Sequence, residues 1–431
     1  MPDTLTTFST ISTDAPNVWI SERMYTLTER RLQIGQWAQK YTLPQRMSKT
    51  MRVVRYRRLA LPRATLTEGF APDAVALAVD NVDVTVEQWG IVVLITDVGL
   101  ITTKHPALNI AINRTALAMA EVLEREMAVM LLAGTTVSYG GTSNSARGDL
   151  AAGDVINTGL ILQATTRLRA NGAPDWDSGL FGGVMPPQAE ADVLKSDLTF
   201  QNATTYANVK ALQYAEIGVW QSVRWTRGNF LPFFEGVAAP DTAAATAKKS
   251  QITAGTSGSM ATGNYQVRVV ARDTNSYYER RISQNSANLS VTGPSGSIAV
   301  ALPTSLNYVY DVYCSSVGAT ATRLAVAAQT GATTYTITEV PGSTAAAPPA
   351  APASGVETFV AWVFGQDAFG RVELGGMSLQ SYITPPGASY SNPLAQGRKV
   401  GSKIMWKSFI QDNDFFVRLE FASSFSAYLA A

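Results

Sequence analysis

The sequence predicts an α+β fold into which a separate all-β sandwich is inserted. Three observations predict this arrangement. Two strand-like stretches between residues 46 and 104 carry opposite charge, a helix of about 27 residues follows them, and two Ala/Pro-rich segments bracket a series of short strands. Apolar residues at every second position indicate strands, whereas steps of three and four residues indicate a helix.

The composition is that of a globular protein with few chemically reactive side chains. The 431 residues carry 34 Lys+Arg and 33 Asp+Glu, a balance that argues against a dedicated nucleic-acid-binding protein. One Cys and one His exclude a disulfide framework and most metal or acid–base chemistry. No apolar run approaches the ~20 residues that span a bilayer, and no secretory signal pattern is visible. We therefore expect a protein made in a cytosol and not bound to a membrane.

Residues 1–45 are rich in Thr and Ser and predict an N-terminal arm, and residues 46–104 predict a long two-limbed β extension. The extension sorts its charge, because the first limb has no acidic residue and the return limb has no basic one. The basic residues are Arg46, Lys49, Arg52, Arg55, Arg57, Arg58 and Arg63, and the acidic residues are Glu68, Asp73, Asp80, Asp83, Glu87 and Asp97. The apolar run Ile91 to Ile95 predicts that the return limb then enters a core.

This sorting of charge indicates a binding partner, since a solvated strand face usually mixes both signs. The partner is either phosphate or the oppositely charged limb of a neighbouring copy. We favour the neighbour, because opposite patches can steer and align identical subunits. The candidate intersubunit contacts are Arg52, Arg55, Arg57, Arg58, Glu68, Asp73, Asp80, Asp83 and Glu87. Reversal of Arg55 and Arg57 to Glu is expected to prevent association while the subunit stays folded.

Residues 105–236 and 356–431 predict one discontinuous domain. Its first element is a helix from Pro106 to Ala133, with a proline suited to the first turn and Gly134 as the C-terminal cap. A second helix is expected over roughly 153–170. Further elements are a short strand at FGGVM, a helix from about Gln188, and strands near Ile217 and Val223.

Residues 237–355 predict an inserted domain between two flexible linkers. About six or seven strands alternate within it, including those around Val267, Ile298 and Tyr310, which is typical of a small sandwich. The segment has no Trp and a single Cys, so a fibronectin-like or bacterial immunoglobulin-like module fits better than an antibody domain. Cys314 falls on an apolar strand face and is expected to be a small core residue.

No pattern in the chain predicts catalysis. His105 has no accompanying nucleophile motif, and the acidic limb is best interpreted as a solvated strand face rather than a metal site. Arg147-Gly148-Asp149 is a sequence that some adhesion receptors bind, but a plain Gly/Ser loop is the better interpretation. We therefore expect no catalytic residue, metal ligand or cofactor, and no enzymatic activity.

Three segments carry a resemblance to a known family, and they are EIGVWQSVRWTRGNFLPFFEG (216–236), FVAWVFGQDAFGRVEL (359–374) and NPLAQGRKVGSKIMWKSF (392–409). They resemble a Gly-Val-Arg strand, an apolar strand with a Gly-x-Asp-Ala-Phe/Tyr-Gly turn, and a Pro-Leu-x-Gln closing segment. This chain has Gly401-Ser402-Lys403 where a bulky aromatic residue is usual before the Lys. With the arm, extension and long helix, the order resembles the major capsid proteins of tailed bacteriophages, whose shell fold is the Hong Kong 97 type. The more specific resemblance is to the coat-protein family typified by phage N-four, over most of 20–236 and 356–431.

The resemblance implies an extension loop over residues 47–102 that overlaps an adjacent subunit, a spine helix over 106–133, and an axial domain from 182–236 and 359–425. It implies a virion protein, assembled in the bacterial host cytoplasm, whose hexamers and pentamers enclose double-stranded DNA. The implied partners are many copies of itself, a cement or decoration protein, a portal, and packaged DNA bound non-specifically on the inner face. The insert would lie on the shell exterior.

Two other classes of function stay open. A surface adhesin or carbohydrate-binding protein would act through the β-sandwich, and binding by the insert without self-assembly would favour it. A hydrolase is the enzyme alternative, and it lacks a nucleophile or metal constellation in the sequence.

Overall fold

The computed structural model describes residues 33–56, 59, 65, 76–96, 99, 107–176, 179–196, 216–229, 231–274, 279–304, 307–331, 333–375, 380–384 and 397–427. The chain divides into two compact units, the first made from 1–30, 38–130 and 367–412 and the second from 31–37, 131–366 and 413–431. Within the residues just given, no helix is long and apolar enough to cross a bilayer.

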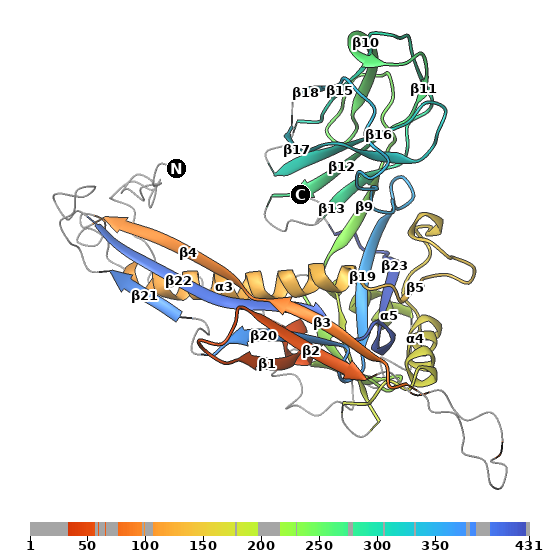
Figure 1. Cartoon of the computed structure of the whole chain (residues 1–431). Coiled ribbons are helices and arrows are strands. Elements are labelled where there is room, and N and C mark those ends of the chain that lie inside the picture. The colour runs from red at the N-terminus through yellow and green to blue at the C-terminus, as the bar shows by residue number, and fades with distance from the viewer. Residues whose placement is uncertain are drawn as a thin grey trace, which may run out of the picture. The chain divides into compact units, whose positions relative to one another are not determined.

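The first unit is built on a five-stranded sheet and a separate two-stranded ribbon (Figure 1). Its strands are β1 (Gln39–Leu43), β2 (Thr50–Tyr56), β3 (Val79–Thr85), β4 (Glu87–Thr96), β20 (Phe369–Leu374), β21 (Gln380–Thr384) and β22 (Gly397–Ile410). β22 pairs antiparallel with β20, β21 and β4, and β1 joins β20 in parallel. The long helix α3 spans Ala107–Leu132, which confirms the predicted helix to within one residue at each end.

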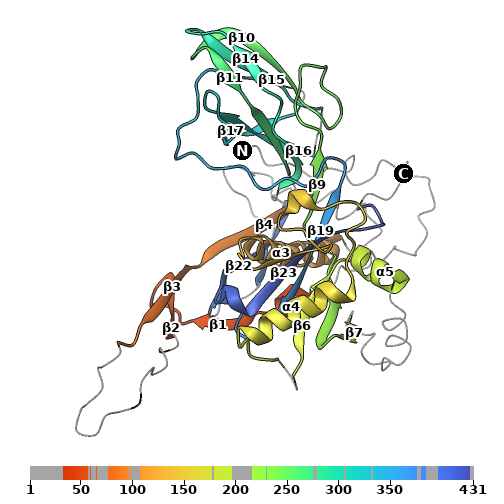
Figure 2. The same cartoon turned by 90° about the vertical axis from the view of Figure 1, so that its right-hand side faces the viewer.

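β2 and β3 form the predicted ribbon. They pair antiparallel over seven residues, from Thr50 opposite Thr85 to Tyr56 opposite Val79, and both views show them side by side (Figures 1 and 2). Side chains alternate between the two faces of a strand. One face packs through Met51 and Val82 on a core that also contains the following residues: Leu43, Val53, Val84, Val86, Val372 and Phe409. The opposite face is exposed.

The prediction that the return limb enters a core at Ile91–Ile95 is wrong for most of that run. Ile91 and Val92 are 38% and 64% exposed, and only Ile95 is buried, where it packs with Ala111 and Val400. β4 pairs with β22 rather than continuing beside β2. Helix α3 packs on β4 near Ile95, and Val129 and Met130 of α3 line a hollow with Trp89 near the start of the strand. Ile91 and Val92 are successive residues, so their side chains point to opposite faces of β4.

The second unit contains an eleven-stranded sheet flanked by two helices. The strands outside the insert are β5 (Val137–Tyr139), β6 (Phe181–Met185), β7 (Glu216–Trp220), β8 (Val223–Arg227), β9 (Phe233–Val237), β19 (Glu357–Phe364) and β23 (Phe416–Ala422). The helices α4 (Thr158–Ala170) and α5 (Pro187–Ser196) pack on the sheet (Figure 2), and three short 3-10 turns cover Ile34–Trp37, Arg147–Asp149 and Asn413–Phe415. Their shared core includes Ile161, Phe181, Val193, Trp225 and Phe421. These elements confirm the predicted strands at FGGVM, Ile217 and Val223 and the helix near Gln188.

Two predicted helix ends differ in detail. α4 begins at Thr158 rather than near 153, because Asn157 caps it by accepting a hydrogen bond from the Leu160 N–H at 2.9 Å. Gly134 does follow α3, but a close approach explains the glycine. A Cβ atom there would lie 2.2 Å from the buried Phe416 ring, so a larger residue cannot fit without displacement of that ring.

In the described part of residues 237–355, the structure has nine strands, where the sequence predicts about six or seven. They are β10 (Gln251–Met260), β11 (Gly263–Tyr265), β12 (Val267–Asp273), β13 (Glu279–Ser283), β14 (Leu289–Val291), β15 (Gly296–Ala301), β16 (Tyr308–Ser315), β17 (Thr322–Thr330) and β18 (Thr334–Ile337). A sheet of β10, β15 and β18 and the series β17-β16-β12-β13 supply one common core, which includes Ile252, Tyr265, Val300 and Cys314. β10 was not predicted because its sequence, QITAGTSGSM, has few apolar residues to alternate.

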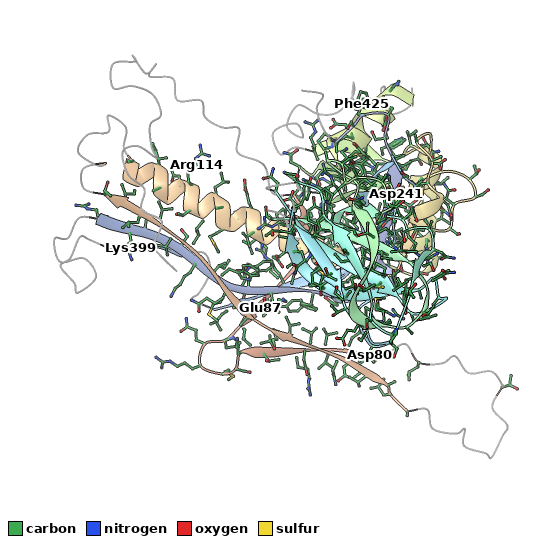
Figure 3. All side chains as sticks on the ribbon, turned by 90° about the horizontal axis from the view of Figure 1, so that it is seen from above. Asp80, Glu87, Arg114, Asp241, Lys399 and Phe425 are labelled. Carbon is green, nitrogen blue, oxygen red and sulfur yellow. The ribbon has the colours of Figure 1, made fainter. Side chains whose placement is uncertain are left out.

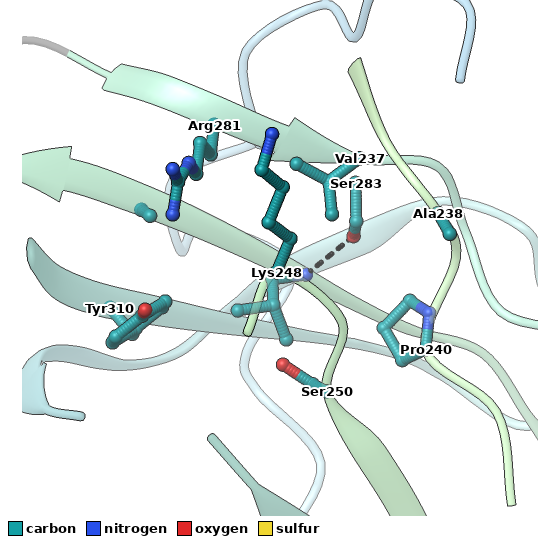
Figure 4. Close-up of a pocket in the computed structure, with 10 residues that line it drawn as sticks. Val237, Ala238, Pro240, Lys248, Ser250, Arg281, Ser283 and Tyr310 are labelled. Atoms are coloured by element: carbon teal, nitrogen blue, oxygen red, sulfur yellow. Dashed lines mark hydrogen bonds between the residues drawn. The ribbon is translucent and has the colours of Figure 1, made fainter. Parts of the chain in front are cut away.

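The insert is joined to the rest of the second unit, here called the carrier domain, by hydrogen bonds and ion pairs as well as by the two linkers. β13 pairs in parallel with β9, with Arg281 opposite Glu235, so the insert strands continue the eleven-stranded sheet. The buried Glu235 carboxylate forms ion pairs with Lys248 and with Arg281, the latter at 3.0 Å. Lys248 and Arg281 also line a cavity of about 10 Å³ at this junction (Figure 4). Both segments predicted as flexible linkers make contacts: Lys248 forms the ion pair with Glu235, and the Pro349 and Pro352 carbonyl oxygens accept hydrogen bonds from Arg268 and Gln284. The Ala/Pro composition alone does not reveal these contacts.

Cys314 lies in the sandwich core, as predicted. Burial raises the pKa of its thiol to about 12. Only on the order of one thiol in ten thousand would be ionised at pH 8, and the thiolate is the reactive form. We expect no reaction with a thiol reagent such as Ellman's reagent in the folded subunit and one equivalent after denaturation. Rapid labelling of the folded subunit would contradict the buried position.

Candidate functional site

The first candidate pair of charges lies on the exposed face of the ribbon. Arg52 and Asp83 stand opposite each other in the β2–β3 register, and the guanidinium donates to the two carboxylate oxygens at 2.6 and 2.7 Å. The hydrogen bond from Arg52 lowers the pKa of the Asp83 carboxyl. A carboxyl whose pKa is lowered in the folded state stabilises the fold at neutral pH. That stabilisation is lost as the pH falls through the folded-state pKa. The pair aligns the two limbs of one ribbon.

Arg55 has a different environment. It extends from the other face of β2 and forms an ion pair with Asp412, whose side chain is only 7% exposed. Its guanidinium also approaches the Gln411 carbonyl oxygen at 3.5 Å. Asp80 stands opposite Arg55 in the ribbon register. Arg55 therefore connects the ribbon to the end of β22 within the same chain, so reversal of Arg55 would disturb the fold as well as any contact between copies.

Substitution of Arg55 by Met is expected to lower the free energy of unfolding by about 1–2 kcal/mol. The buried Asp412 carboxylate would lose its ion pair with Arg55, and the 41% exposure of Arg55 keeps the effect below that of a fully buried pair. Urea denaturation of the unassembled subunit measures the change. Arg52→Met is the matched control, because its pair is open to solvent, and it should lower the denaturation midpoint much less than Arg55→Met. Equal effects of the two substitutions would contradict this assignment.

The remaining candidate residues fall in two groups. Glu87, at the start of β4, forms an ion pair with Lys407 at 2.8 Å. The positions of Asp80 and Glu87 can be followed in Figure 3. The second group, which lies outside the described residues, is Arg57, Arg58, Glu68 and Asp73. The structure thus brings Arg52 together with Asp83, and it pairs Arg55 and Glu87 with residues of the C-terminal segment.

Sequence reasoning missed an exposed apolar surface on the ribbon. Val54 and Tyr56 of β2 lie beside Asn81 and Val79 of β3 on the outer face, and Leu77 precedes β3. Tyr56 is 63% exposed. The signal is in the sequence, since Val54 and Tyr56 are out of phase with the inward-facing Met51 and Val53. The ribbon therefore offers apolar as well as charged contacts.

The Arg-Gly-Asp sequence is not available to a receptor. Arg147 is buried and donates two hydrogen bonds to the Glu420 carboxylate at 2.8 and 2.6 Å, and its guanidinium lies 3.7 Å from the Phe234 ring centre. Asp149 accepts hydrogen bonds from the backbone N–H groups of Ser145 and Ala146, which lower the pKa of its carboxyl. Both charged residues therefore have structural roles.

No cluster of three His, Cys, Asp or Glu side chains suited to a metal ion occurs in the part of the chain that the structure describes. His105 lies outside that part. The geometry that remains as a functional surface is the ribbon with its neighbouring β4 strand.

No family model matches the chain, and no curated protein matches its sequence. The capsid of Ralstonia phage GP4 contains a chain with a TM-score of 0.53 at 12% identity, covering 98% of this chain and 100% of that one. The capsid asymmetric unit of cyanophage Pam1 contains one with a TM-score of 0.51 at 12% identity, covering 99% and 100%. At this identity the likeness establishes a shared fold, so the α+β fold of this chain is that of phage capsid structures.

Proposed function

We propose that this chain is a major capsid protein of a tailed bacteriophage, with the Hong Kong 97-type fold, that assembles into an icosahedral head around double-stranded DNA. The observation that carries the proposal is the full-length likeness of fold to phage capsid structures. The role is structural and not enzymatic. Its location is the virion, after assembly in the host cytoplasm.

Surface features of the subunit support self-association. The β2–β3 ribbon exposes Val54, Tyr56 and Val79, and β4 exposes Ile91 and Val92. Isolated soluble domains seldom leave several large apolar side chains on one ribbon face exposed, as Val54, Tyr56 and Val79 are, because such side chains gain free energy by burial. Copies that cover these faces in a closed shell would bury them without aggregation. The partners are copies of the chain in hexamers and pentamers, together with a portal, a cement or decoration protein, and DNA bound non-specifically.

The insert, residues 237–355, is proposed to be an immunoglobulin-like or fibronectin-like module displayed on the outer surface. The pairing of β13 with β9 and the Glu235 ion pairs support a fixed orientation on its carrier domain.

Purification of the full chain and negative-stain electron microscopy test the proposed function. We expect closed particles, and sedimentation velocity should show a fast species of many subunits. Monomers or small oligomers at every protein concentration and salt concentration would contradict a shell-forming role. Binding of the intact monomer to an immobilised glycan array, without particles, would instead support a carbohydrate-binding protein or adhesin acting through the sandwich.

A further inference from the structure

A basic hollow lies at the base of the ribbon, where the chain turns from β1 into β2. Its volume is about 340 Å³, and the turn residues 46–49 line it together with Val86, Leu374 and Met405. Met47 is 80% exposed. Methionine side chains adapt to apolar partners of different shapes. The hollow therefore combines an adaptable apolar surface with the cations of Arg46 and Lys49.

The turn that forms the hollow is held in place. Arg46 has a φ of 65°, in the left-handed region that residues other than Gly seldom adopt. The Lys49 carbonyl accepts a hydrogen bond from the Val86 N–H at 3.0 Å, and the Ser48 hydroxyl accepts one from the Thr50 N–H at 3.0 Å. Strained backbone maintained by surrounding bonds is a feature of binding sites.

The basic side chains of the extension that the structure describes divide into those that form an ion pair within the chain and those that do not. Within the described ranges, Arg52 pairs with Asp83 and Arg55 with Asp412, whereas the side chains of Arg46 and Lys49 form no ion pair. These two cations point to an acidic ligand.

The segment that joins β2 to β3 has the complementary chemistry in its second half. Residues 64–78 contain Glu68 and Asp73 and no Lys or Arg, and Phe70 lies between the two acids. The segment has two acidic residues on either side of an aromatic residue, and the hollow has two basic residues beside two methionines. The two sets are complementary in charge, and both contain apolar side chains. Charge complementarity of this kind determines register as well as association rate.

We propose that the hollow at residues 46–49 receives residues 68–73 of a second copy of this chain. The inference rests on the proposed self-assembly and names the contact that produces it. The segment is attached at the far end of the seven-residue ribbon, roughly 20 Å from the base. The contact therefore uses different patches on the two copies, and such head-to-tail contacts close into rings.

Two charge-reversal variants test the contact in assembly. The base variant is Arg46→Glu with Lys49→Glu, and the segment variant is Glu68→Lys with Asp73→Lys. Each variant alone should form no rings or shells. An equal mixture should form rings with an even number of subunits, because each variant's segment fits the other's base, and the fourfold variant should assemble like the wild type. Rescue by the fourfold variant without rescue by the mixture would place the contact within one chain and overturn the proposal.

Peptide binding gives a readout that does not depend on shells. A fluorescent peptide of residues 64–78 should bind the segment variant, whose hollow is intact, and bind the base variant at least tenfold more weakly. Arg167→Glu with Arg169→Glu on exposed α4 is the matched control, with the same change of charge and unaltered binding. Equal binding by all variants would overturn the inference even if shells form. Selective binding without any shells would leave the inference standing and reject the proposed function.

Discussion

Substitution of Arg147 by Met is expected to lower the free energy of unfolding of the subunit by about 2–3 kcal/mol, because two hydrogen bonds to a buried carboxylate are lost. Arg147 is one of three charges in a buried cluster with Glu420, which is fully buried, and Arg418, whose guanidinium lies 2.9 Å from the same carboxylate. Burial lowers the pKa of Arg418, and Glu420 opposes that shift. Loss of Arg147 leaves the carboxylate with a single cation in a site that excludes water.

The loss of Arg147 also removes packing and a hydrogen bond. Its guanidinium covers the Phe234 ring and donates to the Ala350 carbonyl oxygen at 3.0 Å, so it joins β23, β9 and the end of the insert. Chemical denaturation of the unassembled subunit measures the change, and Arg169→Met on the exposed face of α4 is the control. Replacement of all three charges by Met, Met and Leu should recover most of the loss. A change below about 1 kcal/mol for Arg147→Met would contradict a stabilising role.

Substitution of Gly236 by Ala is the second large effect, with an expected loss of about 3 kcal/mol. A Cβ atom at this position would lie 1.9 Å from the Ala353 carbonyl oxygen, which belongs to the backbone and cannot rotate away. Relief of the clash must break the hydrogen bonds from Gly236 N–H to Val356 at 2.9 Å and from Gly355 N–H to Gly236 at 2.8 Å.

Two measurements separate this local effect from general unfolding. Thermal denaturation should show a lower midpoint. Limited proteolysis should show new cleavage between residues 341 and 356, the segment that leads from the insert back to β19, because this segment would detach. Gly153→Ala is the matched control, because a Cβ atom there meets nothing within 4 Å. Unchanged proteolysis of Gly236→Ala would mean that these hydrogen bonds do not hold residues 341–356 in place.

The sorted charge of the extension illustrates how far the sequence can be interpreted. Opposite signs on two strand-like limbs predict a ribbon, and β2 and β3 form it in the expected antiparallel register. The same pattern does not say whether an acid pairs within its own chain or with another copy. In the structure Arg52 forms an ion pair with Asp83, and Arg55 forms one with Asp412. Asp412 lies more than 350 residues from Arg55 in the sequence. The proposal of intersubunit contacts now depends chiefly on the hollow at residues 46–49 and on the segment between the limbs.

Periodicity in the sequence determined the elements whose side chains alternate between core and solvent. Helix α3, the ribbon strands and the alternating strands of the insert follow from local patterns, and so does the burial of Cys314. Local patterns suffice because each such element shows its buried face through the spacing of its own residues.

Only the tertiary structure decided which faces stay exposed and which segments meet. Ile91 and Val92 of β4 are exposed, Arg147 is buried against Glu420 while Gly148 and Asp149 stay at the surface, and β9 pairs with β13 of the insert. Each of these outcomes depends on contacts between residues far apart along the chain. Their energies arise from burial and pairing in three dimensions, which no short stretch of sequence contains.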